Sequence, residues 1–195
     1  MFMDFDDVSR GYSHAQHIGM VIAGAVMQVY LKVKYVDVDS ITGIIKSIKI
    51  PSNRPDPKDL PLAKKYHELH LAGRDDEIPY KAMMLTTVVA EARRMVRLEH
   101  GPDFFETNLS GLKIGPVAFV GIAGEPFMGI GKGIKETEGY ELIMPACLTN
   151  GDEGYFPMQE AYDEGGYEAR SSIFKAGVAE LLIEEGKKLL GEMNK

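Results

Sequence analysis

The chain has 195 residues, of which 45% are hydrophobic and 26% are charged, a balance typical of a globular domain with a hydrophobic core. Its net charge of −7, from 22 basic and 29 acidic residues, argues against a nucleic-acid partner. The single cysteine, Cys147, excludes an intramolecular disulfide and a zinc site built from several cysteines.

The first ten residues give no sign of a targeting segment. They are acidic, whereas a secretory signal peptide begins basic and continues apolar, so a cytoplasmic location is the default expectation. Met1–Asp7 has the character of a strand-to-helix connection. The best apolar run, Ile18–Leu31, is shorter than the roughly 20 residues that a bilayer requires, so no transmembrane segment is expected.

Apolar periodicity predicts alternating helices and strands along the chain. Ser13 suits the N-cap of the first helix, and Ile41–Ile50 alternates apolar and polar residues as a half-buried strand does. The expected helices are His14–Lys34, Pro61–Ala72, Tyr80–His100, a short one from Phe127, and Ser171–Met193. The expected strands are Ile41–Ile50, Leu109–Ile114, Val117–Ile122 and Tyr140–Ala146. This order predicts an α/β fold with a layered mixed sheet flanked by helices.

Two pairs of histidines lie on expected helices. His14 and His17 are one turn apart, and they form either a metal-ligand pair or part of a solvated helix start. His67 and His70 have no third ligand candidate nearby in sequence, so we expect both on the surface.

Three arginines lie outside the apolar stripe of the expected helix Tyr80–His100. They are Arg93, Arg94 and Arg97. A charge run of this kind is typical of a solvated helix face, and we predict that all three side chains are exposed.

The candidate functional residues follow the strand Val117–Ile122. Glu125 comes directly after it, and a glycine- and tyrosine-rich segment, Asn150–Tyr167, follows later. Reactive groups in open α/β sheets collect where strands end. A carboxylate is a normal zinc ligand, and a tyrosine becomes one when the metal lowers its pKa. A second tyrosine can stabilise an oxyanion, although the same residues also suit a purely structural loop.

The sequence of these segments resembles the neutral/alkaline non-lysosomal ceramidase family, and within it the bacterial ceramidase-like branch. The resemblance implies that residues 1–195 form the C-terminal portion of that family's catalytic domain; on residue patterns alone they equally suit a single domain. The motifs that carry it are Gly121-x-x-Gly124-Glu125-Pro126-Phe127, Thr149-Asn150-Gly151-x-x-Gly154-Tyr155-x-Pro157 and Glu160-Ala161-Tyr162-x-Glu164-Gly165-Gly166-Tyr167-Glu168.

The resemblance implies a zinc-dependent amide hydrolase that splits an N-acyl lipid such as ceramide into a sphingoid base and a fatty acid. By position, Glu125 and Tyr155 match zinc ligands and Tyr167 matches a catalytic tyrosine. The family's two zinc histidines and its nucleophilic serine lie upstream of the matched region. The expected partners are therefore the amide substrate and an upstream half of the same domain.

Two other interpretations remain open at the level of sequence. The chain is either a non-catalytic binding or scaffold domain that retains a ceramidase-like core, or part of an amidase for another N-acylated substrate. No residue pattern identifies the acyl pocket, so lipid, sugar and peptide amides are all candidates.

Overall fold

The computed structural model of the protein describes residues 11–194, and the chain divides into two compact units. The first unit ends at Asp37 and contains helix α1 (Gly11–Tyr30), which ends at Tyr30 rather than at Lys34. No residue of α1 is buried. The interpretation of Met1–Asp7 as a connection lies outside the described residues. Within residues 11–194, no helix is both long enough and apolar enough to cross a membrane.

The second unit begins at Val38 and is built on a four-stranded mixed sheet. The strands, in spatial order, are β1 (Ile41–Pro51), β2 (Phe104–Ile114), β3 (Val117–Ile122) and β5 (Leu142–Ala146). β2 is antiparallel to both β1 and β3, whereas β5 is parallel to β3. This sheet and the helices beside it confirm the predicted fold class. β2 begins at Phe104 rather than at Leu109, because Phe104 pairs with Pro51 at the end of β1.

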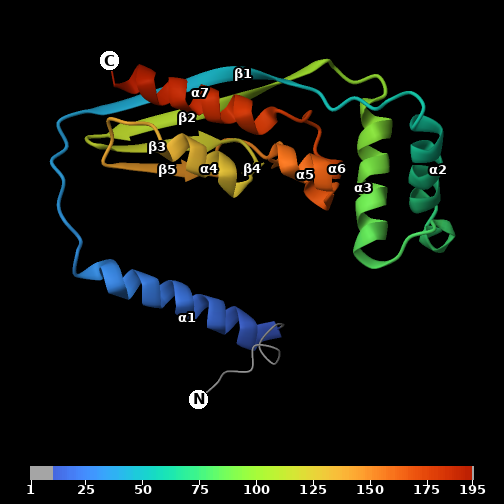
Figure 1. Cartoon of the computed structure of the whole chain (residues 1–195), viewed down its shortest axis with the longest axis horizontal. Helices are drawn as coiled ribbons and strands as arrows, with labels where there is room; N and C mark the ends of the chain where they lie inside the picture. Colours follow the sequence, from blue (N-terminus) through green and yellow to red (C-terminus); the bar gives the residue numbers. More distant parts are fainter. Residues whose placement is uncertain (1–10, 195) are drawn as a thin grey trace. The chain divides into compact units, whose positions relative to one another are not determined.

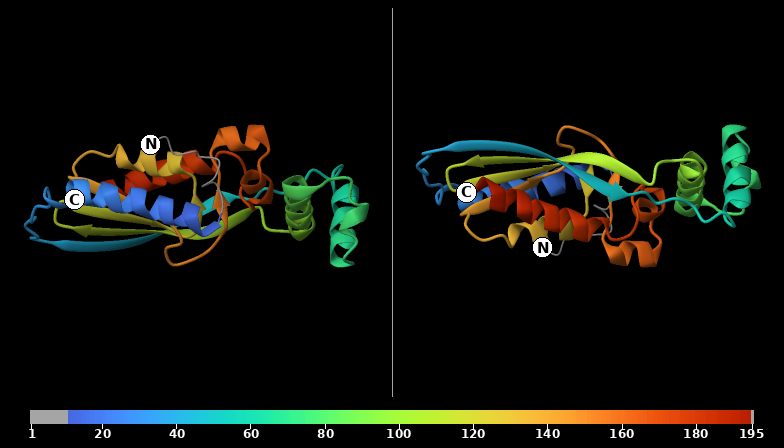
Figure 2. Two further views of the ribbon diagram at one scale, coloured as in Figure 1. Left: turned by 90° about the horizontal axis from the view of Figure 1, so that it is seen from below. Right: turned by 90° about the horizontal axis from the view of Figure 1, so that it is seen from above.

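Helices α4 (Met128–Lys135) and α7 (Val178–Met193) pack against the sheet (Figures 1 and 2). Ile48 and Ile50 of β1 are buried in the same core as α7, whereas Lys49 between them is exposed. This is the alternation that a half-buried strand requires. The largest buried side chains of this core include Leu109, Ile122, Ile130, Ile134, Phe156, Phe174, Leu182, Leu189 and Leu190.

A second, smaller core lies between helices α2 (Leu60–Leu71) and α3 (Ala82–Leu98), which are joined through the 3-10 helix η2 (Asp75–Glu77). The rings of Tyr66 and Tyr80 meet edge-on there, with centroids 6.2 Å apart. In Figure 2 this helix pair extends beyond the ends of β1 and β2. One side of α3 contacts helix α6 (Tyr167–Ser171), which comes later in the chain.

The prediction of two surface histidines on α2 is correct for one of them. His70 is exposed, and its Nδ1 lies 2.8 Å from a carboxylate oxygen of Asp75. His67 is half-buried instead, and its Nδ1 is buried without a hydrogen-bond partner among residues 11–194. The prediction for His67 is therefore wrong, because the surrounding packing covers its Nδ1 atom.

The predicted C-terminal helix Ser171–Met193 is wrong in its first third. That stretch is divided between α6 (Tyr167–Ser171) and an extended segment, and α7 begins only at Val178 after Gly177, whose φ is +96°. The extended segment pairs with the end of β1: Asn53 donates from its backbone N to the Ile173 carbonyl over 2.8 Å. These non-local bonds replace the helical ones.

Candidate active site

The site is built on a two-stranded parallel sheet that sequence periodicity does not reveal. β4 (Glu125–Pro126) pairs with β6 (Tyr155–Phe156), and in this register Glu125 lies opposite Tyr155. The backbone N of Glu125 donates to the Gly154 carbonyl over 2.8 Å. A Cβ on Gly124 would lie 2.6 Å from that same carbonyl oxygen, so only glycine permits this close approach. The β4–β6 pairing thereby places Glu125 beside Tyr155, which lies far from it in sequence.

Tyr167 joins the same point from helix α6. It is the first residue of α6 after Gly166, and its ring meets the Tyr155 ring edge-on with centroids 6.1 Å apart. Ser172 donates from Oγ to the Tyr155 carbonyl over 2.9 Å, which ties the end of α6 to β6. The structure therefore brings Glu125, Tyr155 and Tyr167 together.

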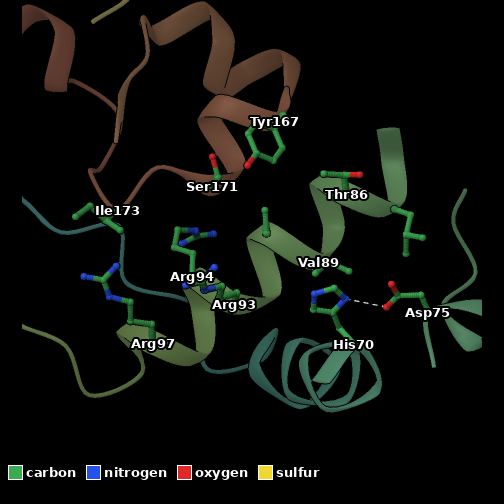
Figure 3. Close-up of a pocket in the computed structure, with 12 residues that line it drawn as sticks. His70, Asp75, Thr86, Val89, Arg93, Arg94, Arg97, Tyr167, Ser171 and Ile173 are labelled. Atoms are coloured by element: carbon green, nitrogen blue, oxygen red, sulfur yellow. Dashed lines mark hydrogen bonds and ion pairs between the residues drawn. The ribbon is translucent and has the colours of Figure 1, made fainter. Parts of the chain in front are cut away.

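These three residues line a pocket of about 530 Å³. Its other walls come from the loop before β6 and from α3, which contributes Arg93 and Arg97. An adjoining pocket of about 410 Å³ shares Arg93, Arg97 and Tyr167 and extends along α3 toward Asp75 (Figure 3). Figure 3 shows Tyr167 on α6 on the opposite side of this pocket from the arginines of α3.

The side-chain oxygens of the three residues have no hydrogen-bond partner inside the described part of the chain. Among residues 11–194, neither the Glu125 carboxylate nor the hydroxyls of Tyr155 and Tyr167 have such a bond. Two other tyrosines behave differently: Tyr140 donates to the Leu190 carbonyl, and Tyr162 donates to the Phe174 carbonyl, each over 2.7 Å. These two hydroxyls each have a backbone partner, whereas those of Tyr155 and Tyr167 face the pocket without one among residues 11–194.

The carboxylate of Glu125 perturbs its neighbour. Its negative charge, together with partial burial and the nearby Tyr167, raises the pKa of the Tyr155 hydroxyl above its ordinary value. Tyr155 is therefore a neutral phenol near pH 7. A divalent cation placed between the two oxygens would reverse this effect, because a metal ion favours the phenolate.

The donor set matches zinc in kind but is incomplete. Glu125 and Tyr155 supply two oxygen donors, whereas a catalytic zinc takes three protein ligands and keeps one open position. Within residues 11–194, no group of three or more His, Cys, Asp or Glu side chains lies close enough to hold a metal ion. His14 and His17 belong to the other unit of the chain.

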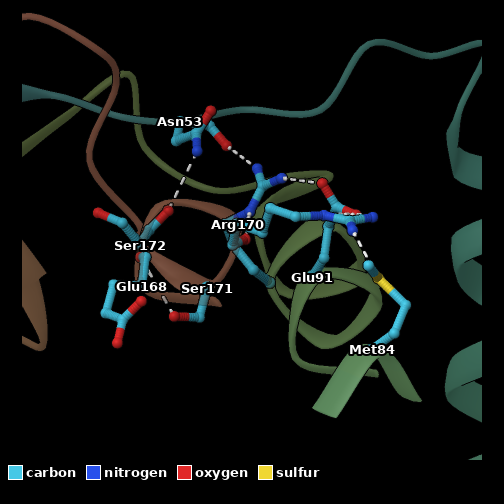
Figure 4. Close-up of polar contacts among 8 residues, drawn as sticks. Asn53, Met84, Glu91, Glu168, Arg170, Ser171 and Ser172 are labelled. Carbon is cyan, nitrogen blue, oxygen red and sulfur yellow. Dashed lines mark hydrogen bonds and ion pairs between the residues drawn. The ribbon is translucent and has the colours of Figure 1, made fainter. Parts of the chain in front are cut away.

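Buried hydrogen bonds and an ion pair hold α6, which carries Tyr167, against α3. Arg94 donates through Nε to the Arg170 carbonyl over 2.9 Å and through a terminal nitrogen to the Asn53 carbonyl over 2.6 Å. Arg170 in turn forms an ion pair with Glu91 on α3 (Figure 4). Arg94 is only 7% exposed, so the prediction that its side chain is solvated is wrong. The guanidinium is buried because it satisfies backbone carbonyls of two other segments.

Arg93 and Arg97 are exposed, as the sequence predicts, but their position in the pocket was not foreseen. The charge of these two residues does not indicate from the sequence that they line a pocket. The pocket arises from the packing of α3 against α6, a contact between segments separated by some 75 residues of sequence.

Two solved structures that match part of this chain are ceramidases. Neutral ceramidase from Pseudomonas aeruginosa matches 43% of this chain and 15% of its own length, with 19% identity and a TM-score of 0.37. A ceramidase complexed with C2 matches 47% of this chain and 16% of its own length, with 19% identity and a TM-score of 0.38. No protein-family model and no curated protein sequence matches the chain. The matched part of the chain thus spans about a sixth of the length of these ceramidases.

Proposed function

We propose that this chain supplies part of the active site of a zinc-dependent, ceramidase-like amide hydrolase. In this proposal Glu125 and Tyr155 are two of the zinc ligands and Tyr167 is a catalytic residue. The remaining ligands and the nucleophile lie outside residues 1–195. The substrate is an N-acylated molecule, and an N-acyl sphingoid base is the first one to test.

One observation carries the proposal: three oxygen-bearing side chains that the sequence singles out meet in one pocket with no hydrogen bond among residues 11–194. Other residues of the same motifs have clear structural tasks. Gly124 permits the β4–β6 contact, Gly165 ends α5 (Gln159–Glu164) with φ +74°, and the Tyr162 hydroxyl bonds to a backbone carbonyl. Glu125, Tyr155 and Tyr167 have no such task, which is the pattern expected of residues kept for a ligand.

Each residue has a distinct chemical role. Zinc, when bound, polarises the amide carbonyl and activates the attacking group. Glu125 presents a carboxylate oxygen at the exposed end of β4, and Tyr155 presents its hydroxyl from the paired position on β6. Tyr167 is half-buried with its ring edge-on to Tyr155, and its hydroxyl can donate to the oxyanion formed on the carbonyl oxygen.

The proposal is tested by measuring hydrolysis of a short-chain N-acyl sphingosine by the complete protein in which this chain occurs. Tyr167→Phe removes only the hydroxyl, and loss of one oxyanion donor is expected to lower kcat about 100-fold. Tyr80→Phe makes the same chemical change outside the pocket and is expected to retain full activity. Full activity of Tyr167→Phe would remove Tyr167 from the mechanism.

The test also separates the proposal from a non-catalytic role. A binding or scaffold domain predicts no hydrolysis of any N-acylated compound, and no difference between the two variants. Hydrolysis of other N-acyl compounds without hydrolysis of the sphingoid substrate would retain the amidase and change only its specificity.

A further inference from the structure

We propose that Arg93 and Arg97 bind an oxyanionic group of the substrate, so that the amide hydrolysed belongs to an N-acylated compound with a carboxylate or phosphate. The inference deepens the proposed function by naming a substrate class, and it relies on that function only for the presence of an acyl amide. The anion site itself rests on the arginines.

The two arginines differ from every other arginine within residues 11–194. The other four hold an acidic or carbonyl partner: Arg54 with Asp103, Arg74 with Glu77, Arg94 with two backbone carbonyls, and Arg170 with Glu91. Arg93 and Arg97 make no hydrogen bond or ion pair in that part of the chain. In a chain with a net charge of −7, two unpaired guanidiniums side by side call for an explanation.

Their spacing puts both guanidiniums on one side of α3. Residues four apart are neighbours on a helix surface, and like charges at this spacing disfavour the helix. Both side chains also line both pockets, beside Tyr167. An anion bound between the two guanidiniums would attract both of them and offset their mutual repulsion. The guanidinium is suited to the task because its planar fork binds carboxylate and phosphate through paired hydrogen bonds.

The two pockets differ in their acidic residues, although Arg93 and Arg97 line both of them. Glu125, Asp152 and Glu153 line the 530 Å³ pocket, where a cation is proposed to bind. The only acid that lines the 410 Å³ pocket within the described residues is Asp75, and it is already paired with His70. A substrate with its amide near Tyr167 can therefore place an anionic group beside α3 without meeting an unpaired carboxylate.

The lining of the 410 Å³ pocket combines charged and apolar side chains. Beside the arginines it includes Leu85, Val89 and Ile173, which offer short apolar contacts. An N-acyl sphingoid base carries no charge there and would leave both guanidiniums without a partner. An N-acyl amino acid, or an N-acyl amine with a phosphate, provides the missing charge.

The proposal is tested by calorimetric titration of the metal-free protein with three ligands below their micelle-forming concentrations. N-decanoylglycine carries a carboxylate, N-decanoyl-phosphoethanolamine carries a phosphate, and N-decanoylglycinamide is neutral. At least one anionic ligand is expected to bind about tenfold tighter than the neutral one, which corresponds to one charge-assisted hydrogen bond. The tighter of the two anionic ligands identifies the oxyanion.

The double variant Arg93→Gln/Arg97→Gln is expected to bind all three ligands equally. Lys49→Gln/Lys188→Gln removes the same charge from residues that line neither pocket, and is expected to keep the tenfold preference. Equal binding by the unmodified protein, or a preference that survives in the arginine variant, would overturn the proposal. Zinc and hydrolysis play no part in this titration, so its outcome is independent of whether the amidase proposal succeeds.

Discussion

Replacement of Arg94 by methionine tests the claim that a buried guanidinium holds the pocket wall together. Methionine keeps much of the length and apolar volume of the side chain but removes both hydrogen bonds. The carbonyls of Asn53 and Arg170 then lose their donor in a place where Arg94 itself was only 7% exposed.

The magnitude follows from these two carbonyls. An unsatisfied buried acceptor costs about 1–3 kcal/mol, and the gain from no longer burying a charge offsets part of the sum. Burial also lowers the pKa of the Arg94 guanidinium, which is the sign of that desolvation cost. We expect Arg94→Met to lower the free energy of unfolding by about 3 kcal/mol.

The assay is urea unfolding followed by circular dichroism. With an m-value of about 3 kcal/mol/M, the loss moves the midpoint down by about 1 M. Arg93→Met is the matched control, because it changes the neighbouring exposed residue, and it is expected to stay within about 0.5 kcal/mol of the unmodified protein. Equal midpoints for the two variants would refute the structural role assigned to Arg94.

Three further predictions concern stability. Gly191→Ala places its Cβ in open space within α7 and is expected to stabilise the protein by about 0.5–1 kcal/mol, measured by the same urea titration. Gly186→Ala, on the same helix, brings its Cβ to 2.9 Å from the Ile134 side chain, so destabilisation of about 1 kcal/mol is expected; a gain would contradict the packing of α4 on α7. Hydrogen bonds from Lys188 and Lys46 lower the pKa of Glu185 below its ordinary value of 4.5. Its contribution is therefore complete above that value and lost as the pH falls through the lowered pKa, and Glu185→Gln is expected to weaken the acid dependence of the urea midpoint.

The longer helices and strands were predictable because their apolar residues recur with a helical or strand period. Ile41–Pro51 alternates along its whole length, and the β2–β3 hairpin turns at Gly115, with φ +53°, as its Gly-Pro dipeptide indicates. The second unit therefore has the α/β architecture that the sequence predicts. Local periodicity does not determine where the elements end, because tertiary pairing extends β2 and α7 begins only after Gly177.

The structure brings together the three residues that the sequence motifs single out, but their setting was not predictable from the sequence. Glu125, Tyr155 and Tyr167 were identified from short motifs, yet the β4–β6 pairing that joins the first two covers only two residues on each strand. No periodicity develops over so short a length. Likewise, the burial of Arg94 and the exposure of Arg93 depend on where α6 packs, which no local pattern on α3 encodes.

The central claim is that Glu125 and Tyr155 hold zinc, and the most direct test is the metal content of the complete protein by mass spectrometry. About one zinc per chain is expected for the unmodified protein and for Asp163→Asn, which removes a carboxylate outside the pocket. Glu125→Gln and Tyr155→Phe are each expected to lower the zinc content and to raise the Kd at least about tenfold. Unchanged zinc in both of these variants would contradict the account.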